Sequence, residues 1–143
     1  MNKPLCRVLL VSDSPEVNQI VREALGRDRH LELVAECRQG QEGTKLLPLH
    51  HPDLVLLNSP LPDKTAQVFI HKAKAICAAA RIILISGRSE MTGYVMAQRK
   101  GADGYISRRL LQNELPLVLG RYHELAPEWG HRFSPWKEHY GMA

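Results

Sequence analysis

The chain has 143 residues, which is enough for one domain with a sizeable core but not for two. Hydrophobic residues make up 44% and charged residues 24% of it, and no apolar run approaches the roughly 20 residues of a membrane span, so we expect a soluble, cytoplasmic, globular protein. The net charge of +4 favours encounters with acidic partners or nucleic acid without specifying either. The three cysteines have no C-x-x-C spacing and lie in apolar segments, which predicts reduced core residues and no zinc site.

The chain begins with a predicted strand followed by a helix. Residues 7–11 form a short, continuous, Val/Leu-rich run, typical of a strand buried on both faces, and the run stops at Ser12 and Asp13. Ser14 has the position of a helix N-cap, and apolar residues recur at helical spacing over 15–26.

A second strand and helix precede the central apolar run. Apolar and polar residues alternate over 31–37, which predicts a strand with one more exposed face, as at the edge of a sheet. A weaker helix is expected over 40–49, and Pro52 requires it to end by His51. Residues 54–57, between Asp53 and Asn58, are all apolar, so we expect a third strand that is buried on both faces.

The second half of the chain repeats this alternation. An apolar stripe predicts a helix over 66–80, and a β-branched run at 81–86 predicts a fourth strand before another helix. A short fifth strand is expected at 105–107. A last helix is expected over about 113–122, because Pro116 is tolerated only in the first turn of a helix.

Strands and helices that alternate through short connections predict right-handed crossovers, and hence an α/β, doubly wound parallel sheet with helices on both faces. The carboxyl ends of parallel strands lie at one edge of such a sheet, which is where ligands bind. We call this edge the mouth. It is expected to collect the polar residues that follow the strands, namely Ser12, Asp13, Asn58, Ser86, Ser107 and Arg108.

Four separated motifs resemble the receiver domain of two-component response regulators. They are Val-Leu-Leu-Val-Ser-Asp-Ser-Pro at 8–15, Pro-Asp-Leu-Val-Leu-Leu-Asn-Ser-Pro-Leu-Pro-Asp at 52–63, Ile-Ile-Leu-Ile-Ser-Gly at 82–87 and Gly-Ala-Asp-Gly-Tyr-Ile-Ser-Arg at 101–108. Their order and gaps match the family. The resemblance implies a five-stranded flavodoxin-like sheet with strand order 2-1-3-4-5. We therefore expect a receiver-like domain at 1–125 and an aromatic-rich C-terminal tail at 126–143.

In that family an aspartate takes a phosphoryl group, two acidic residues hold Mg²⁺, a Ser/Thr and a Lys contact the phosphoryl oxygens, and an aromatic residue reports the state. By motif, the phosphoacceptor position is Asn58 and the positions of the two acidic residues are Ser12 and Asp13. The phosphoryl-contact positions are Ser86 and Arg108, and the aromatic position is Tyr105. Only Asp13, Ser86 and Tyr105 agree with the family pattern. The departures fall on the groups that carry out the chemistry.

These departures predict a pseudo-receiver that has lost its phosphoryl chemistry. The carboxamide of Asn58 is neutral and poorly nucleophilic, so it forms no stable acyl phosphate. Mg²⁺ prefers anionic oxygen, and Asp13 is the only carboxylate left at these positions. We expect no enzyme activity, no metal and no cofactor, and a regulatory role through protein–protein interaction.

Two site residues leave alternatives open. Arg108 either reaches Asp13 or Asn58 and fills the metal and phosphoryl space, or points to solvent. Tyr105, at the position of the family's switch aromatic, either moves between buried and exposed rotamers or is a static side chain at the edge of a partner surface, and the loss of phosphoryl chemistry favours the static one. Asp103 is expected to be a turn residue with no catalytic role.

The tail and the basic residues bear on partners. Four aromatic residues of the tail either pack back on the domain or form a partner-binding or dimer-forming segment: Trp129, Phe133, Trp136 and Tyr140. Basic residues of the second half could form one face on the last two helices and the fifth strand, which is either merely solvated or binds an acidic protein: Arg81, Arg88, Arg99, Lys100, Arg108, Arg109 and Arg121. The sequence shows no helix-turn-helix after the receiver-like region, so nucleic acid is not expected.

A second class of function is a flavodoxin-like enzyme, or a domain that binds a phosphate-bearing ligand at the same mouth. Such a protein would favour a Gly- or Thr-rich first loop whose backbone cradles phosphate. The loop Ser-Asp-Ser-Pro-Glu at 12–16 has neither residue type, and its two acids repel phosphate. The sequence therefore favours the binding module over the enzyme.

Overall fold

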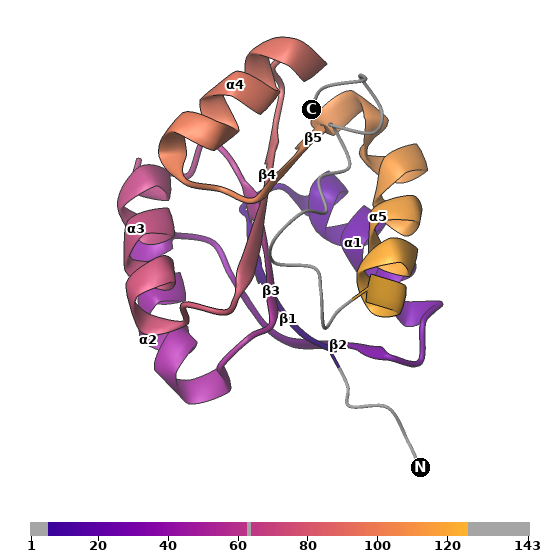
Figure 1. Cartoon of the computed structure of the whole chain (residues 1–143), viewed down its shortest axis with the longest axis horizontal. Coiled ribbons are helices and arrows are strands. Elements are labelled where there is room, and N and C mark those ends of the chain that lie inside the picture. Colours follow the sequence, from indigo (N-terminus) through magenta and orange to yellow (C-terminus); the bar gives the residue numbers. More distant parts are fainter. Residues whose placement is uncertain (1–5, 63, 126–143) are drawn as a thin grey trace.

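A computed structural model describes residues 6–62 and 64–125. The five strands are β1 (Cys6–Val11), β2 (Leu31–Cys37), β3 (Leu54–Asn58), β4 (Arg81–Ser86) and β5 (Gly104–Ser107). The helices are α1 (Pro15–Gly26), α2 (Gly40–His50), α3 (Ala66–Ile76), α4 (Glu90–Lys100), the short 3₁₀ helix η1 (Arg108–Leu110) and α5 (Leu111–Leu125). All neighbouring strands pair in parallel in the order β2-β1-β3-β4-β5, which confirms the predicted fold (Figure 1). Within the described part, no helix is long and apolar enough to cross a membrane.

The sheet separates two apolar layers (Figure 1). One core cluster joins β1, β3 and β4 to α1 and α5, and the other joins the opposite faces of the same strands to α2, α3 and α4. Strand β3 is buried at every position, as expected for a strand covered on both faces. Strand β2 lies at the sheet edge and is partly exposed, which confirms the prediction from its alternating pattern.

Two helix ends follow the sequence signals closely. Ser14 is the N-cap of α1, and its hydroxyl oxygen accepts a hydrogen bond from the Val17 N–H at 3.2 Å. Helix α2 ends at His50, directly before His51, whose φ of 45° is left-handed. The chain can then enter β3 through Pro52.

Two other helix boundaries differ from the prediction. Helix α3 was expected to reach Ala80 but ends at Ile76, because a turn closed by the Ala80 N–H on the Cys77 carbonyl leads into β4. Ala80 is only 2% exposed, so it continues the apolar pattern without being helical. Helix α5 spans Leu111–Leu125 instead of 113–122, and Pro116 lies in its interior.

The position of Pro116 reflects packing. The apolar stripe of α5 includes Leu111 and Leu115, each 0% exposed, and Val118 and Leu119 continue it into the core beside α1. Burial of such side chains contributes roughly 1.5–3 kcal/mol each. Together they outweigh the cost of about 3 kcal/mol that a proline imposes on a helix interior.

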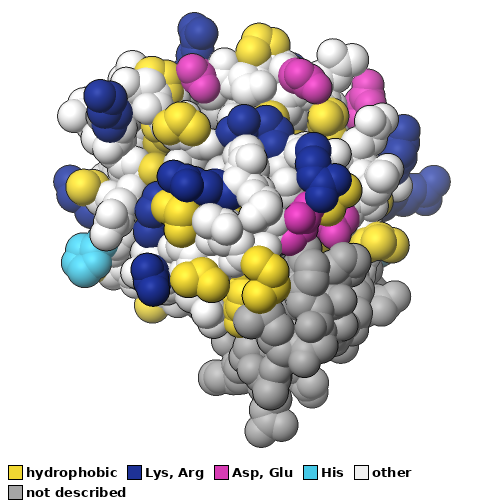
Figure 2. All heavy atoms as spheres, turned by 90° about the horizontal axis from the view of Figure 1, so that it is seen from above, with side chains coloured by type: hydrophobic (Ala, Val, Ile, Leu, Met, Phe, Trp, Pro, Cys, Tyr) yellow, Lys and Arg dark blue, Asp and Glu magenta, His cyan; other side chains and the backbone are white. Residues whose placement is uncertain are grey.

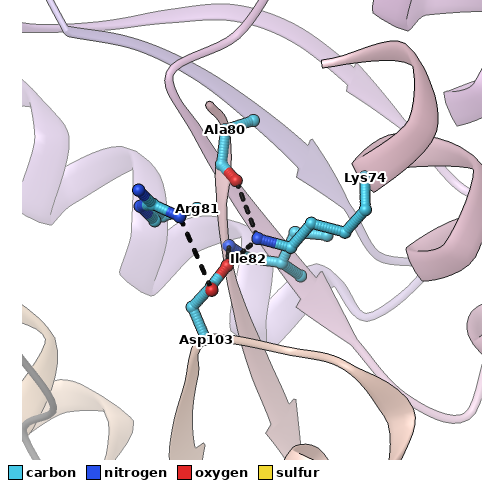
Figure 3. Close-up of polar contacts among 5 residues, drawn as sticks. All are labelled: Lys74, Ala80, Arg81, Ile82 and Asp103. Atoms are coloured by element: carbon cyan, nitrogen blue, oxygen red, sulfur yellow. Dashed lines mark hydrogen bonds and ion pairs between the residues drawn. The ribbon is translucent and has the colours of Figure 1, made fainter. Parts of the chain in front are cut away.

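Asp103 ties three elements together at the amino end of β4, opposite the mouth (Figure 3). Its carboxylate accepts a hydrogen bond from the Ile82 N–H at 2.8 Å and forms ion pairs with Lys74 and, at 3.8 Å, with Arg81. The Lys74 ammonium also donates to the Ala80 carbonyl at 3.0 Å. Asp103 thus fixes the end of α3 and the start of β4 to the turn before β5, in agreement with its expected role as a turn residue.

Replacement of Asp103 by Asn tests this anchor. The amide can still accept from Ile82 but loses both ion pairs, so we expect the free energy of unfolding to fall by about 1–2 kcal/mol in urea titrations. Glu32→Gln, which neutralises an exposed carboxylate of β2, is the matched control and should change it by less than about 0.5 kcal/mol. Equal effects of the two replacements would contradict the assignment.

Candidate functional site

The mouth collects the polar residues that the sequence placed there. Ser12 follows β1, Asn58 ends β3, Ser86 ends β4 and Ser107 ends β5, and these four are buried, with exposures of 1%, 3%, 9% and 2%. Arg108 follows at once in η1. The prediction that these side chains meet at one edge of the sheet is confirmed.

Among the described residues, the side chain of Asn58 bonds to a hydroxyl and to a guanidinium. Its Nδ2 donates to the Ser12 hydroxyl at 3.4 Å, and its Oδ1 accepts from Arg108 Nε at 3.2 Å. The Ser12 hydroxyl also accepts from the Ser14 N–H at 3.2 Å. The amide therefore has partners for both its carbonyl and its amino group, as a side chain this deeply buried requires.

Arg108 crosses the mouth from η1 to the end of β3. Besides its bond to Asn58, its Nη2 donates to the Ser59 carbonyl at 2.8 Å. Of the alternatives raised by the sequence, contact with Asn58 is the one observed, while within the described part of the chain no ion pair joins Arg108 to Asp13. The planar guanidinium suits this bridge because its donors diverge in one plane toward two acceptors.

The residues at the metal position fit Mg²⁺ poorly. Asp13 contributes one carboxylate, Ser12 a hydroxyl and Asn58 an amide, and the last two are already bonded to each other. Within residues 6–62 and 64–125, no group of three His, Cys, Asp or Glu side chains lies where it could hold a metal ion. Magnesium sites in phosphoryl-transfer proteins use carboxylates for most of their protein ligands, so this donor set is too weakly anionic.

Tyr105 is buried, with 5% of its surface exposed, and its role at the edge of a partner surface stays a prediction. Its hydroxyl lies 3.0 Å from the Ser86 hydroxyl and donates to the Arg88 carbonyl at 2.7 Å. Burial raises the pKa of the phenol above its usual value. The side chain thus connects β5 to the end of β4 and the loop before α4.

Gly93 makes room for this tyrosine, and the sequence analysis did not identify it. A Cβ added at Gly93 would lie 1.9 Å from Cζ of Tyr105 and 2.4 Å from its hydroxyl oxygen. No side chain fits there while the ring keeps its place. The available signal was a glycine within the helical segment of α4, where glycine is unfavourable without a packing reason.

Comparisons with known proteins agree with this architecture. The family model described as response regulator receiver domain matches residues 8–119. The chain is 25% identical over 114 residues to the nitrate/nitrite response regulator protein NarL of Escherichia coli, covering 80% of this chain and 53% of NarL. It is 28% identical over 100 residues to the chemotaxis protein CheY of Bacillus subtilis, covering 70% and 82%. The chain thus spans about half the length of NarL but most of CheY.

Solved structures show the same fold. The isolated REC domain of RcsB from Salmonella enterica superposes with a TM-score of 0.76 at 18% identity, covering 92% of this chain and 94% of that one. The signal receiver domain of the putative response regulator NarL from Mycobacterium tuberculosis superposes with a TM-score of 0.74 at 22% identity, covering 85% and 98%. At these identities the likeness concerns the fold alone.

The bridge made by Arg108 generates a stability prediction. Arg108→Ala removes two charge-assisted hydrogen bonds and leaves Oδ1 of Asn58 without its donor, so we expect a loss of about 1–3 kcal/mol in the free energy of unfolding. Arg88→Ala is the control, because its side chain is exposed and its backbone contacts survive the replacement. An Arg108→Ala protein as stable as Arg88→Ala would show that the bridge contributes nothing.

The fit between Gly93 and Tyr105 generates a double-mutant cycle. Gly93→Ala alone should cost about 1–3 kcal/mol, because the new methyl group forces the ring out of its place. In a Tyr105→Leu background the same replacement should raise stability by up to about 1 kcal/mol, since alanine is the better helix residue. The measurement is urea unfolding of all four proteins, and additive effects would refute the proposed contact.

Proposed function

Because the chain belongs to the family of response regulator receiver domains, we propose that it is a phosphorylation-independent receiver that regulates by binding another protein. The observation that carries this proposal is the state of Asn58. An amide stands at the end of β3, where the family has its phosphoacceptor, and it is buried and bonded to Ser12 and Arg108.

The proposal follows from the chemistry of phosphoryl transfer. An acyl phosphate forms when an anionic carboxylate attacks a phosphorus atom, and a neutral amide is a poor nucleophile. Attack would also require Asn58 Oδ1 to leave the guanidinium of Arg108. The second requirement, a divalent cation, is not met by one carboxylate beside a hydroxyl.

The contacts around the mouth support a single fixed conformation. Arg108 joins η1 to the end of β3, and Tyr105 joins β5 to Ser86 and Arg88. In a phosphorylated receiver a bound phosphoryl group would bias such contacts. Here side chains of the protein itself make them, so the signalling surface is presented constitutively.

We place the partner surface on α4, β5 and α5. Met91 and Val95 on α4 are exposed by 50% and 37%, and the last turn of the same helix carries Arg99 and Lys100. Exposed apolar side chains beside cations suit an acidic protein with apolar anchors. Arg81, expected from the sequence to belong to this surface, instead pairs with Asp103 at the opposite edge of the sheet.

The aromatic tail, including Trp129 and Trp136, lies outside the described residues. Its interpretation as a self-packing or partner-binding segment therefore stays a prediction. The other partner that this surface allows is a second copy of the chain. Sedimentation of the purified protein tests this, because a homodimer forms without any other protein present.

Intact mass spectrometry tests the loss of phosphoryl chemistry. We expect the natural protein, incubated with Mg²⁺ and acetyl phosphate, to gain no phosphoryl mass, and its melting temperature to be unchanged by Mg²⁺. The positive control is a variant with Ser12→Asp, Asn58→Asp and Arg108→Lys, which has the family's residue type at each altered position. We expect this variant to gain one phosphoryl group in a Mg²⁺-dependent reaction. Phosphorylation of the natural protein to a comparable level would contradict the proposal.

A further inference from the structure

Two hollows lie at the mouth, and they share no described lining residue. The first, of about 580 Å³, lies over α1 and β2 and includes Asp13, Glu36 and Glu42. The second, of about 430 Å³, lies between the end of β3, the loop after β4 and α4. Both exceed the roughly 300 Å³ at which pockets begin to hold small organic ligands.

The charged residues among the described lining of the second hollow are all cations. They are Arg88, Lys100 and Arg108, and no described lining residue is acidic. Within the described part of the chain, none of these three cations forms an ion pair with a carboxylate. Figure 2, which looks down on the edge where the strands end, shows Lys and Arg predominating over Asp and Glu on the described part of this face.

The same hollow has an apolar side. Leu84 of β4, Met96 of α4 and Pro60 line it, and most of the accessible apolar surface belongs to Pro60, which is exposed, and Met96, which is half-buried. Gly87 and Gly93 also line the hollow, and at both positions only backbone atoms face it. A bare inorganic anion would leave this apolar surface in contact with water, whereas an organic anion would cover it.

We propose that this hollow binds a small organic anion, with an apolar body against Leu84, Pro60 and Met96 and a carboxylate, sulfonate or phosphate group among Arg88, Lys100 and Arg108. The site is separate from the Asp13 side of the mouth, so the ligand does not meet a repelling carboxylate there. Binding is non-covalent and requires neither Mg²⁺ nor a nucleophile at Asn58. The ligand contacts the loop after β4 and the inner side of α4, and so reaches the proposed partner surface on that helix.

This inference rests on the proposed function, to which it adds a small ligand as the signal. The binding experiment uses no phosphoryl donor, so the anion site and the loss of phosphoryl chemistry can be refuted independently. The probe is 8-anilinonaphthalene-1-sulfonate, an aromatic body with one sulfonate, titrated into the full chain and followed by fluorescence. N-phenyl-1-naphthylamine, which has the same body without the sulfonate, is the neutral comparison. Amide NMR spectra report where the probe binds.

The test variant is Arg88→Gln with Lys100→Gln, which removes two cations of the hollow and leaves the Arg108 bridge intact. The matched control is Arg29→Gln with Lys45→Gln, which removes the same charge from exposed positions outside both hollows. We expect the sulfonate to bind the test variant at least tenfold more weakly, the control to bind it as the natural protein does, and the neutral probe to be insensitive to both. The amides of Gly87 and Gly93 should shift on binding.

Three results would overturn the proposal. They are equal weakening in the test and control variants, equal affinity for the sulfonate and the neutral probe, and amide shifts that cluster away from Gly87 and Gly93. A phosphoryl adduct on Asn58 in the separate mass experiment would contradict the proposed function and leave the binding site standing.

Discussion

A buried amide must have its hydrogen bonds satisfied, and this constraint on Asn58 organises the whole mouth. Asn58 is 3% exposed, and its amide accepts a hydrogen bond from Arg108 of η1 and donates one to Ser12 at the end of β1. An aspartate at the same place would be charged, and it could bind a cation or attack a phosphorus atom. The amide instead takes its partners from the chain itself.

A second, independent contact fixes the other half of the site. The hydroxyl of Tyr105 is held by Ser86 and by the Arg88 carbonyl, and its ring occupies the place that Gly93 leaves empty. Because the ring fits only against a residue without a Cβ, α4 lies close to β5. The Arg108 bridge acts on β3 and η1, while Tyr105 acts on β5 and α4. Together they connect every strand end from β3 to β5 through side chains rather than through a ligand.

Local patterns predicted most of the fold and the membership of the site. The apolar run before Asn58, the alternation in β2 and the N-cap at Ser14 each depend on neighbours in the sequence, and each was predicted correctly. The errors arose where packing at a distance decides. Pro116 lies inside α5 because its neighbours face the core, and α3 ends at Ile76 because a turn leads into β4. The fit of Tyr105 against Gly93 also depends on distant packing, and no pattern in the sequence indicated it directly. Sequence spacing fixes which edge a side chain reaches but not the direction in which it points.

The charge at the mouth links the two proposals made for it. The family pattern places three acids and one lysine at the mouth, and the excess of negative charge recruits a divalent cation. Here Asp13 and Arg108 are the only charged members of that set, and their formal charges cancel. On the side of β4 and α4, the added Arg88 and Lys100 make the local balance positive. An electrostatic field of this sign raises the local concentration of anions, and nearby low-dielectric walls focus it further. The proposed loss of phosphoryl chemistry at Asn58 and the proposed binding of a negatively charged ligand beside it therefore follow from the same shift in charge.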